Sequence, residues 1–105
     1  MYCIVYTNGM EFEWDKGNIG KNEKHQVSDE EAEEIFSDLD KAKYPDPKHS
    51  SVEPRYILTG ETQKKRQLLI IYTIRNTRIR IISARDLNKK KERHLYEKAF
   101  NITKV

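Results

Sequence analysis

The chain has 105 residues, a length typical of one domain with a single modest core. Apolar residues make up only 36% of it, but they gather in periodic runs, so we expect the chain to fold. No apolar run approaches the roughly 18 residues of a membrane span, and the first ten residues lack the pattern of a signal peptide. The single cysteine excludes an internal disulfide. We therefore expect one cytoplasmic domain over residues 1–105.

Charge divides the chain into two halves. Residues 1–54 contain 6 lysines and arginines against 13 acids, and residues 55–105 contain 14 against 4. The formal charges are therefore −7 and +10, and all seven arginines lie in the second half. Because the arginine fork binds phosphate at two points, the basic half indicates a phosphate-rich partner. The two halves could equally bind each other, or two different partners.

The first elements are expected to be a short strand or hairpin and then a helix. Residues 2–6 are β-prone, Asn8-Gly9 is a strong turn signal, and residues 11–14 alternate polar and apolar. Asp15 can then cap a helix over about residues 16–24. That segment contains two glycines and only Ile19 as an apolar anchor, so its stability depends on packing.

The next helix has the clearest local pattern of the acidic half. Ser28 and Glu31 have the spacing of a capping box, and Val27 is placed for a hydrophobic staple with Ala32. The acids of the first turn also suit the positive end of the helix dipole. The expected apolar stripe consists of Ala32, Ile35, Phe36 and Leu39.

Three prolines predict a loop over residues 44–54, with room for one edge strand before it. Three strand-like runs follow at residues 55–59, 67–74 and 78–84. Their short connections require antiparallel neighbours, and the middle run is apolar on both faces, so we expect it to be the central strand. Asn88 then begins a final amphipathic helix that turns Leu95, Ala99 and Phe100 inward.

Two features of the basic half could bind phosphate. Strict alternation in the third run places Arg85 on one face with Ile79, and Arg78 and Arg80 on the other. Arg85 then reaches a common site from the strand end, or Arg80 and Arg85 have different roles, one structural and one chemical. Residues 89–91 are lysines in the first turn of the last helix, which fits an anion site or a solvated lysine run.

The three histidines, at positions 25, 49 and 94, have no metal-ligand spacing and no nearby cysteine. We expect neither a metal nor a cofactor. A histidine beside arginines is what metal-free RNA cleavage requires, because it can move the 2′-hydroxyl or 5′-oxygen proton while cations stabilise the phosphate. Taken alone, each histidine is more often structural or exposed than catalytic.

Six motifs together resemble the BrnT family, the ribonuclease toxins of bacterial type II toxin–antitoxin modules. The resemblance runs from about Phe12 to Tyr96 with the motifs in the same order. They are EFEWD (11–15), KHQVS followed by EEAEEIF (24–36), HSSVEPR (49–55), Gly60, IRIISAR (79–85) and KERHLYE (91–97).

The resemblance implies an α+β, RelE-like fold with an antiparallel sheet of three to five strands, two N-terminal helices and a C-terminal helix. It also implies metal-independent endonucleolytic cleavage of RNA that inhibits translation. A BrnA-type antitoxin would neutralise the protein in a hetero-oligomer, and the complex would bind operator DNA through the antitoxin. A non-catalytic module that binds antitoxin or DNA, such as a degenerate toxin, is the alternative.

The resemblance and the basic strand together give the expected site residues. Arg80 and Arg85 would stabilise the scissile phosphate, His25 or His49 would be acid or base, and Glu53 would orient or assist. Trp14 is expected to be a core anchor. The catalytic set is His25, His49, Glu53, Arg55, Arg80 and Arg85, and the RNA-binding set is Lys24, Arg78, Lys89, Lys90, Lys91 and Tyr96, with Glu92 also at a matching position.

Overall fold

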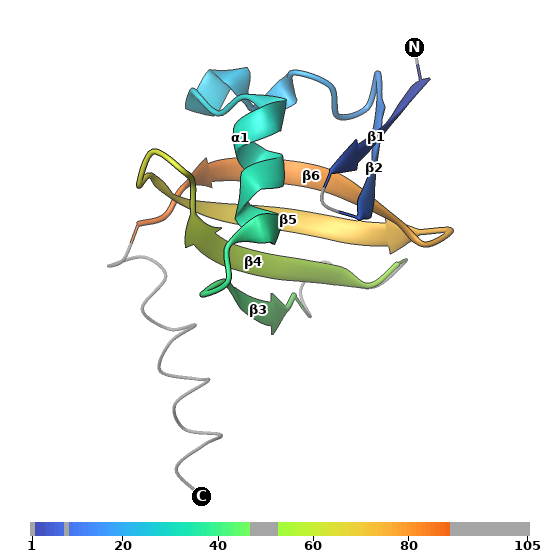
Figure 1. The fold of residues 1–105 in the computed structure, drawn as a ribbon. Coiled ribbons are helices and arrows are strands. Elements are labelled where there is room, and N and C mark those ends of the chain that lie inside the picture. Colours follow the sequence, from blue (N-terminus) through green and yellow to red (C-terminus); the bar gives the residue numbers. More distant parts are fainter. Residues whose placement is uncertain (1, 8, 47–52, 89–105) are drawn as a thin grey trace, which may run out of the picture.

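The computed structural model describes residues 2–7, 9–46 and 53–88. These residues form six strands, one α-helix and two 3-10 helices, shown in Figure 1. The helical elements are η1 (Lys21–His25), α1 (Asp29–Glu34) and η2 (Ile35–Ser37). The strands are β1 (Tyr2–Thr7), β2 (Met10–Asp15), β3 (Ala42–Pro45), β4 (Arg55–Glu61), β5 (Gln67–Arg75) and β6 (Arg78–Asp86).

The six strands form one mixed sheet in the order β1-β2-β6-β5-β4-β3. Four neighbouring pairs are antiparallel, whereas β2 runs parallel to β6 with Phe12 opposite Ile79. The predicted RelE-like arrangement, an antiparallel sheet of three to five strands with two N-terminal helices, is therefore wrong. The N-terminal hairpin joins the sheet through β6, a long-range pairing that local patterns do not reveal. The predicted C-terminal helix lies outside the described residues.

The three strand runs of the basic half are confirmed. They form β4, β5 and β6, which pair antiparallel, and β5 lies between the other two as expected. The predicted loop begins too early, because Tyr44 and Pro45 belong to β3 and pair with Ile57 and Tyr56 of β4. Proline is tolerated there because β3 is the edge strand.

The predicted helix over residues 16–24 is wrong. Turns occupy residues 16–20 and a 3-10 helix follows, with Gly20 in the left-handed region at φ 63°. The Oδ1 atom of Asn18 accepts a hydrogen bond from the backbone N–H of Asp15 at 2.8 Å. Because left-handed backbone cannot continue a right-handed helix, Gly20 explains why no regular helix spans residues 16–24.

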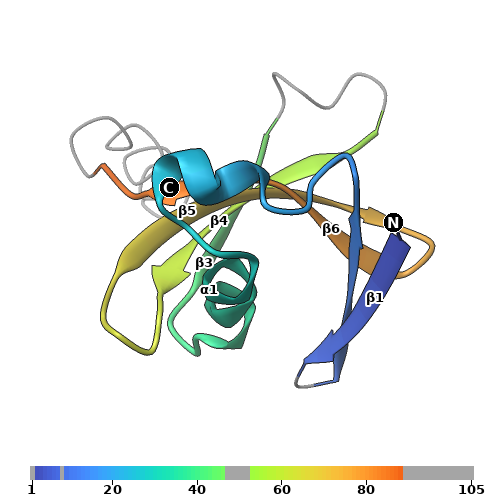
Figure 2. The ribbon, with the colours of Figure 1, turned by 90° about the horizontal axis from the view of Figure 1, so that it is seen from above.

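The capping box of α1 is confirmed. Ser28 accepts a hydrogen bond from the N–H of Glu31, whose carboxylate accepts one from the N–H of Ser28, both at 3.1 Å. Figures 1 and 2 show α1 on one face of the sheet, beside the β1–β2 hairpin. Leu39 was expected on the apolar stripe of this helix, but its side chain is 95% exposed. The helical segment ends with η2 at Ser37, so Leu39 lies beyond it.

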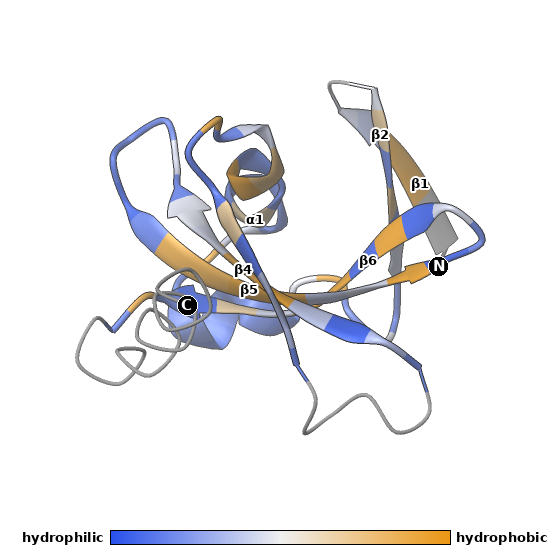
Figure 3. Cartoon of the chain, turned by 90° about the horizontal axis from the view of Figure 1, so that it is seen from below, coloured by the Kyte–Doolittle hydropathy of each residue, from blue (hydrophilic) through white to orange (hydrophobic). Residues whose placement is uncertain are grey.

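The core lies between α1 and the sheet. In Figure 3 much of β5 and a short stretch of the helical segment α1–η2 are hydrophobic, whereas the β4–β5 turn is hydrophilic. Phe36 packs edge-on against Phe12 and Tyr72, with ring centroids 5.2 and 4.9 Å away. The buried cluster also contains Trp14, Val27, Ala32, Ile35, Leu58, Leu68, Ile70, Ile81 and Ala84.

Candidate functional site

A β-bulge in β6 decides which way its arginines point. Ile71 pairs with Ser83 and the next residue, Tyr72, pairs with Ile81, so Ile82 is an extra residue on β6. Alternation is therefore interrupted, and Ile81 and Ala84, three residues apart, are both fully buried in the core.

The bulge brings the arginines of β6 onto one face of the sheet. Arg78, Arg80 and Arg85 lie opposite Arg75, Thr73 and Leu69 of β5, which share the face turned away from the core cluster. The expectation that Arg85 faces away from Arg78 and Arg80 is wrong, because strict alternation does not survive an extra residue.

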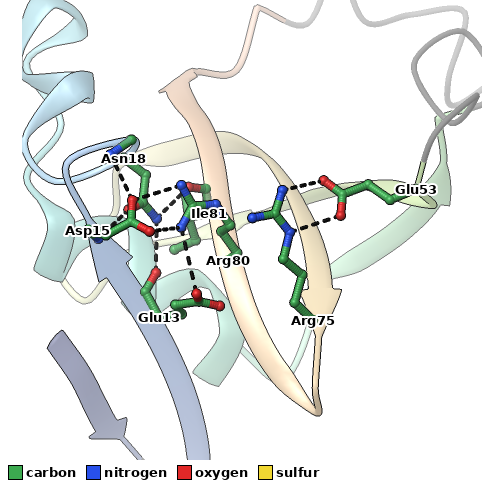
Figure 4. A network of polar contacts seen from close by, with 8 residues as sticks. Glu13, Asp15, Asn18, Glu53, Arg75, Arg80 and Ile81 are labelled. Atoms are coloured by element: carbon green, nitrogen blue, oxygen red, sulfur yellow. Dashed lines mark hydrogen bonds and ion pairs between the residues drawn. The ribbon is translucent and has the colours of Figure 1, made fainter. Parts of the chain in front are cut away.

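Arg80 is held in an ion-pair network with β2, drawn in Figure 4. Its Nη1 and Nη2 atoms lie 2.8 and 2.9 Å from the carboxylate oxygens of Asp15, and Glu13 is 4.0 Å away. The hydrogen bonds from Arg80 lower the pKa of Asp15 to about 2. The guanidinium also lies where a side chain on Gly17 would stand, and only 11% of the Arg80 side chain is exposed.

Two further arginines of this face have carboxylate partners. Arg75 makes a two-point ion pair with Glu53 at 2.9 and 2.7 Å, seen in Figure 4, and Arg78 Nε lies 3.1 Å from Glu11. The hydrogen bond from Arg75 lowers the pKa of Glu53. These acids come from residues 1–54 and these arginines from residues 55–105, so the two charged halves do bind each other.

A hollow of about 380 Å³ lies where η1 meets the end of β6. It brings together three predicted site residues, Lys24, His25 and Arg85. Lys24 and His25 are exposed and Arg85 is half-buried, so their polar groups are within reach of a ligand. The hollow is lined by Lys24, His25, Gln26, Arg85, Asp86 and Asn88.

Two buried asparagines attach the segment that carries His25 to the edge of β6. Asn18 Nδ2 donates to the Ile81 carbonyl at 3.0 Å, and Asn22 Oδ1 accepts from the Ala84 N–H at 2.9 Å. β2 pairs with β6 near Ile79, at the beginning of β6, and does not reach Ile81 and Ala84. The backbone groups of these two residues therefore need other partners. Neither asparagine was among the site residues expected from the sequence, although two asparagines four residues apart in a weak helix were a visible signal.

Arg66, which was also not among the expected site residues, joins three segments around the hollow. Its Nε atom lies 2.7 Å from Asp86 and its Nη1 atom 3.3 Å from Glu31. Its Nη1 also donates to the Gln26 carbonyl, and its Nη2 donates to the His25 carbonyl at 3.2 Å. A lone arginine in the polar turn before β5 gave no sequence pattern that could have identified this role.

The remaining predicted residues are not brought into this hollow or lie outside the described part of the chain. Glu53, Arg55, Arg78 and Arg80 are not among the residues that line it. Residues that fall outside the described ranges are His49, Lys89, Lys90, Lys91, Glu92 and Tyr96.

Two larger hollows have a less suitable charge for a polyanion. One of about 480 Å³ beside α1 contains five carboxylates, and one of about 440 Å³ contains three. Acids at such density repel phosphate. The smaller hollow at His25 and Arg85 is therefore the better candidate for a phosphate ligand.

The described residues also bear on metals and membranes. Across residues 2–7, 9–46 and 53–88, no group of three or more histidine, cysteine or acidic side chains is placed to hold a metal ion. In the same ranges, no helix has the length and apolar character needed to cross a bilayer.

Most of the chain, including the residues of the hollow up to Asn88, matches one protein family. The family model of the ribonuclease toxin BrnT, of type II toxin–antitoxin systems, matches residues 14–91. The chain belongs to the BrnT family. No curated protein matches it. The matched range includes Lys24, His25 and Arg85, and membership makes the chain a ribonuclease toxin whose system includes an antitoxin.

Proposed function

We propose that this BrnT-family toxin cleaves RNA without a metal ion, in the hollow between η1 and β6. The observation that supports it is the meeting of Lys24, His25 and Arg85 in one hollow of about 380 Å³, within a ribonuclease family. A proton-transfer group and two cations in one concave site are what metal-free cleavage needs.

The reaction breaks one bond of the RNA backbone. The 2′-oxygen attacks the adjacent phosphorus, the bond from phosphorus to the 5′-oxygen breaks, and the products end in a 2′,3′-cyclic phosphate and a 5′-hydroxyl. One proton leaves the 2′-hydroxyl and one reaches the 5′-oxygen. His25 transfers one of them and His49 is the candidate for the other, while Arg85 and Lys24 stabilise the charge on the phosphate.

The other predicted residues take different parts in this proposal. Arg80 and Glu53 act as structural ion-pair partners of Asp15 and Arg75, because their charged groups are already engaged at 2.7 to 2.9 Å. Arg55 stays a candidate for the catalytic set. Arg78, Lys89, Lys90, Lys91 and Tyr96 stay candidates for binding the RNA backbone outside the hollow.

The cellular role follows from the chemistry and the family. Cleavage of RNA in the cytoplasm halts translation, and a BrnA-type antitoxin neutralises the toxin by forming a complex with it. Contact with operator DNA occurs through the antitoxin in that complex.

The test is incubation of purified, antitoxin-free protein with RNA in EDTA. We expect fragments that end in 2′,3′-cyclic phosphate, and cleavage at least about 100-fold slower for His25→Ala and Arg85→Ala. Lys64→Ala is the matched control, because Lys64 is an exposed lysine in the β4–β5 turn and does not line the hollow. Cleavage that stops in EDTA, or persists undiminished in His25→Ala, contradicts the proposal.

Intact RNA from a correctly folded protein would favour the alternative, a module that binds without cleaving. Binding through basic residues weakens steeply as salt increases, so a salt titration with labelled RNA measures it. A translation assay then separates cleavage that needs the ribosome from binding alone.

A further inference from the structure

Arg66 has a pattern of contacts unlike that of Arg75 and Arg80. Arg75 and Arg80 each point both arms of the guanidinium at one carboxylate. Arg66 instead divides its donors among Asp86 at the end of β6, Glu31 in α1, and the carbonyls of His25 and Gln26 at the end of η1. One side chain therefore fixes the relative positions of three segments.

The contacts of Arg66 coincide with the wall of the hollow. His25, Gln26 and Asp86 are three of its six lining residues, whereas Arg66 does not itself line it. Gln26 adopts a left-handed backbone with φ 60°, a conformation disfavoured for a residue other than glycine. The hydrogen bonds from Arg66 to the carbonyls of Gln26 and His25 stabilise this turn. They therefore also fix the backbone position of His25.

Arg66 also controls the charge of the hollow. Asp86 adjoins Arg85 and lines the hollow with it, and a free carboxylate there would repel phosphate. The hydrogen bond from Arg66 Nε at 2.7 Å lowers the pKa of Asp86, so Asp86 stays ionised while the guanidinium balances its charge. Lys24 and Arg85 supply the cations on the wall of the hollow.

We propose that Arg66 is a positioning residue of the ribonuclease site. It holds the backbone of His25 beside Arg85 and neutralises Asp86, without touching RNA. The inference rests on the proposed function, since it deepens the account of the same hollow.

Geometry and charge can be separated by substitution. Lysine keeps the positive charge but has a single ammonium group, which cannot reach four acceptors on three segments. In Arg66→Lys we therefore expect kcat to fall roughly 10- to 100-fold with KM nearly unchanged, because a small displacement of a catalytic group has effects of that size. In Arg66→Gln we expect KM to rise as well, because Asp86 loses its counter-charge.

Arg75→Lys is the matched control. Arg75 makes a two-point ion pair with Glu53, but it lies at the far end of β5 and does not line the hollow. Loss of the two-point ion pair in Arg75→Lys should leave kcat and KM within about twofold of wild type, since a partly exposed ion pair contributes little to stability. Equal losses of kcat in Arg66→Lys and Arg75→Lys would show a general effect on folding and overturn the inference.

An NMR measurement tests the same idea without any cleavage assay. The His25 ring signals, assigned with His25→Ala, should move in Arg66→Lys and respond less to added inorganic phosphate, while the Trp14 indole signal stays in place as a check on the core. His25 signals identical to wild type overturn the inference. Wild-type protein that cleaves no RNA overturns the proposed function, and the His25 signals still decide whether Arg66 positions that residue.

A second variant covers the case in which Arg66→Lys does not fold. Asp86→Asn removes one partner of Arg66 at a carboxylate that is 66% exposed, so the fold should survive. We expect a smaller displacement of the His25 signals and a smaller loss of kcat than in Arg66→Lys. Asp86→Asn with wild-type signals and kcat contradicts the inference.

Discussion

Arg80 and Arg85 are five residues apart in one strand, yet their surroundings differ completely. Arg80 is 11% exposed and binds Asp15 at two points, whereas Arg85 lines the hollow with Lys24 and His25. The sequence left open whether the two arginines share one site or have different roles. Their separation in space supports different roles, because a guanidinium that already binds a carboxylate on both arms has little capacity left for phosphate.

The Arg80–Asp15 pair predicts how stability changes in acid. The pKa of Asp15 is lowered from 3.8 to about 2 by hydrogen bonds from Arg80 and from the N–H of Gly17. A lowered folded-state pKa stabilises the protein above the unfolded pKa, and this stabilisation is lost as the pH falls through about 2. Arg80→Gln should therefore make the free energy of unfolding depend less on pH between about 4 and 2.

Urea denaturation at several pH values measures this dependence. Asp15→Asn removes the titrating group and should flatten the same region of the curve. An Arg80→Gln variant that loses stability in acid as steeply as wild type would show that Arg80 is not responsible for the pKa of Asp15.

At the scale of elements, a helix was predicted correctly where its capping side chains bind its own backbone. The prediction was wrong where side chains bind the backbone of another element. The Ser28 capping box predicted α1 correctly because all its partners lie within four residues. Residues 16–24 also had a helix-like start, but Asn18 and Asn22 bond to the backbone of β6 instead. Their partners are more than sixty residues away, so no local pattern could reveal them.

The capping box makes a prediction about α1. Ser28→Ala removes the acceptor for the Glu31 N–H and should lower the free energy of unfolding by about 1 kcal/mol. Ser28→Thr retains a hydroxyl at the cap and serves as the matched control. Denaturation by urea checks both variants, and equal losses in the two would show that the cap hydrogen bond contributes nothing.

At the scale of the whole molecule, ion pairs within the described part of the chain account for part of the charge division. Glu11, Asp15 and Glu53 meet Arg78, Arg80 and Arg75, and Glu31 meets Arg66. A basic half therefore does not become a uniformly basic surface. The proposed RNA site is a restricted region where η1 and the end of β6 place Lys24, His25 and Arg85 together.

Phe36 packs the helical layer against the sheet, so its substitution should have a large effect on stability. It is 6% exposed and contacts Phe12 of β2 and Tyr72 of β5. Phe36→Ala should lower the free energy of unfolding by about 3–5 kcal/mol, because it removes buried apolar surface and leaves a cavity. Phe36→Leu fills most of that space and should lower it clearly less.

Trp14 provides the measurement for this pair of variants. It is the single tryptophan of the chain and is 3% exposed in the same core, so its fluorescence follows unfolding in guanidinium chloride. If Phe36→Ala and Phe36→Leu unfold at the same denaturant concentration as wild type, Phe36 does not connect the layers as described.

The sequence by itself determined the family motifs, the capped helix, three antiparallel strands with β5 in the centre, and the burial of Trp14. The helix and the strands depend on alternation, capping and turn chemistry, whose partners lie close along the chain or follow one period, whereas the burial of Trp14 was implied by the family resemblance. Only the tertiary structure decided the parallel junction of β2 with β6, the bulge at Ile82 and the contacts of Arg66. Each depends on atoms far apart in sequence, and one extra residue in a strand is enough to reverse which face an arginine occupies.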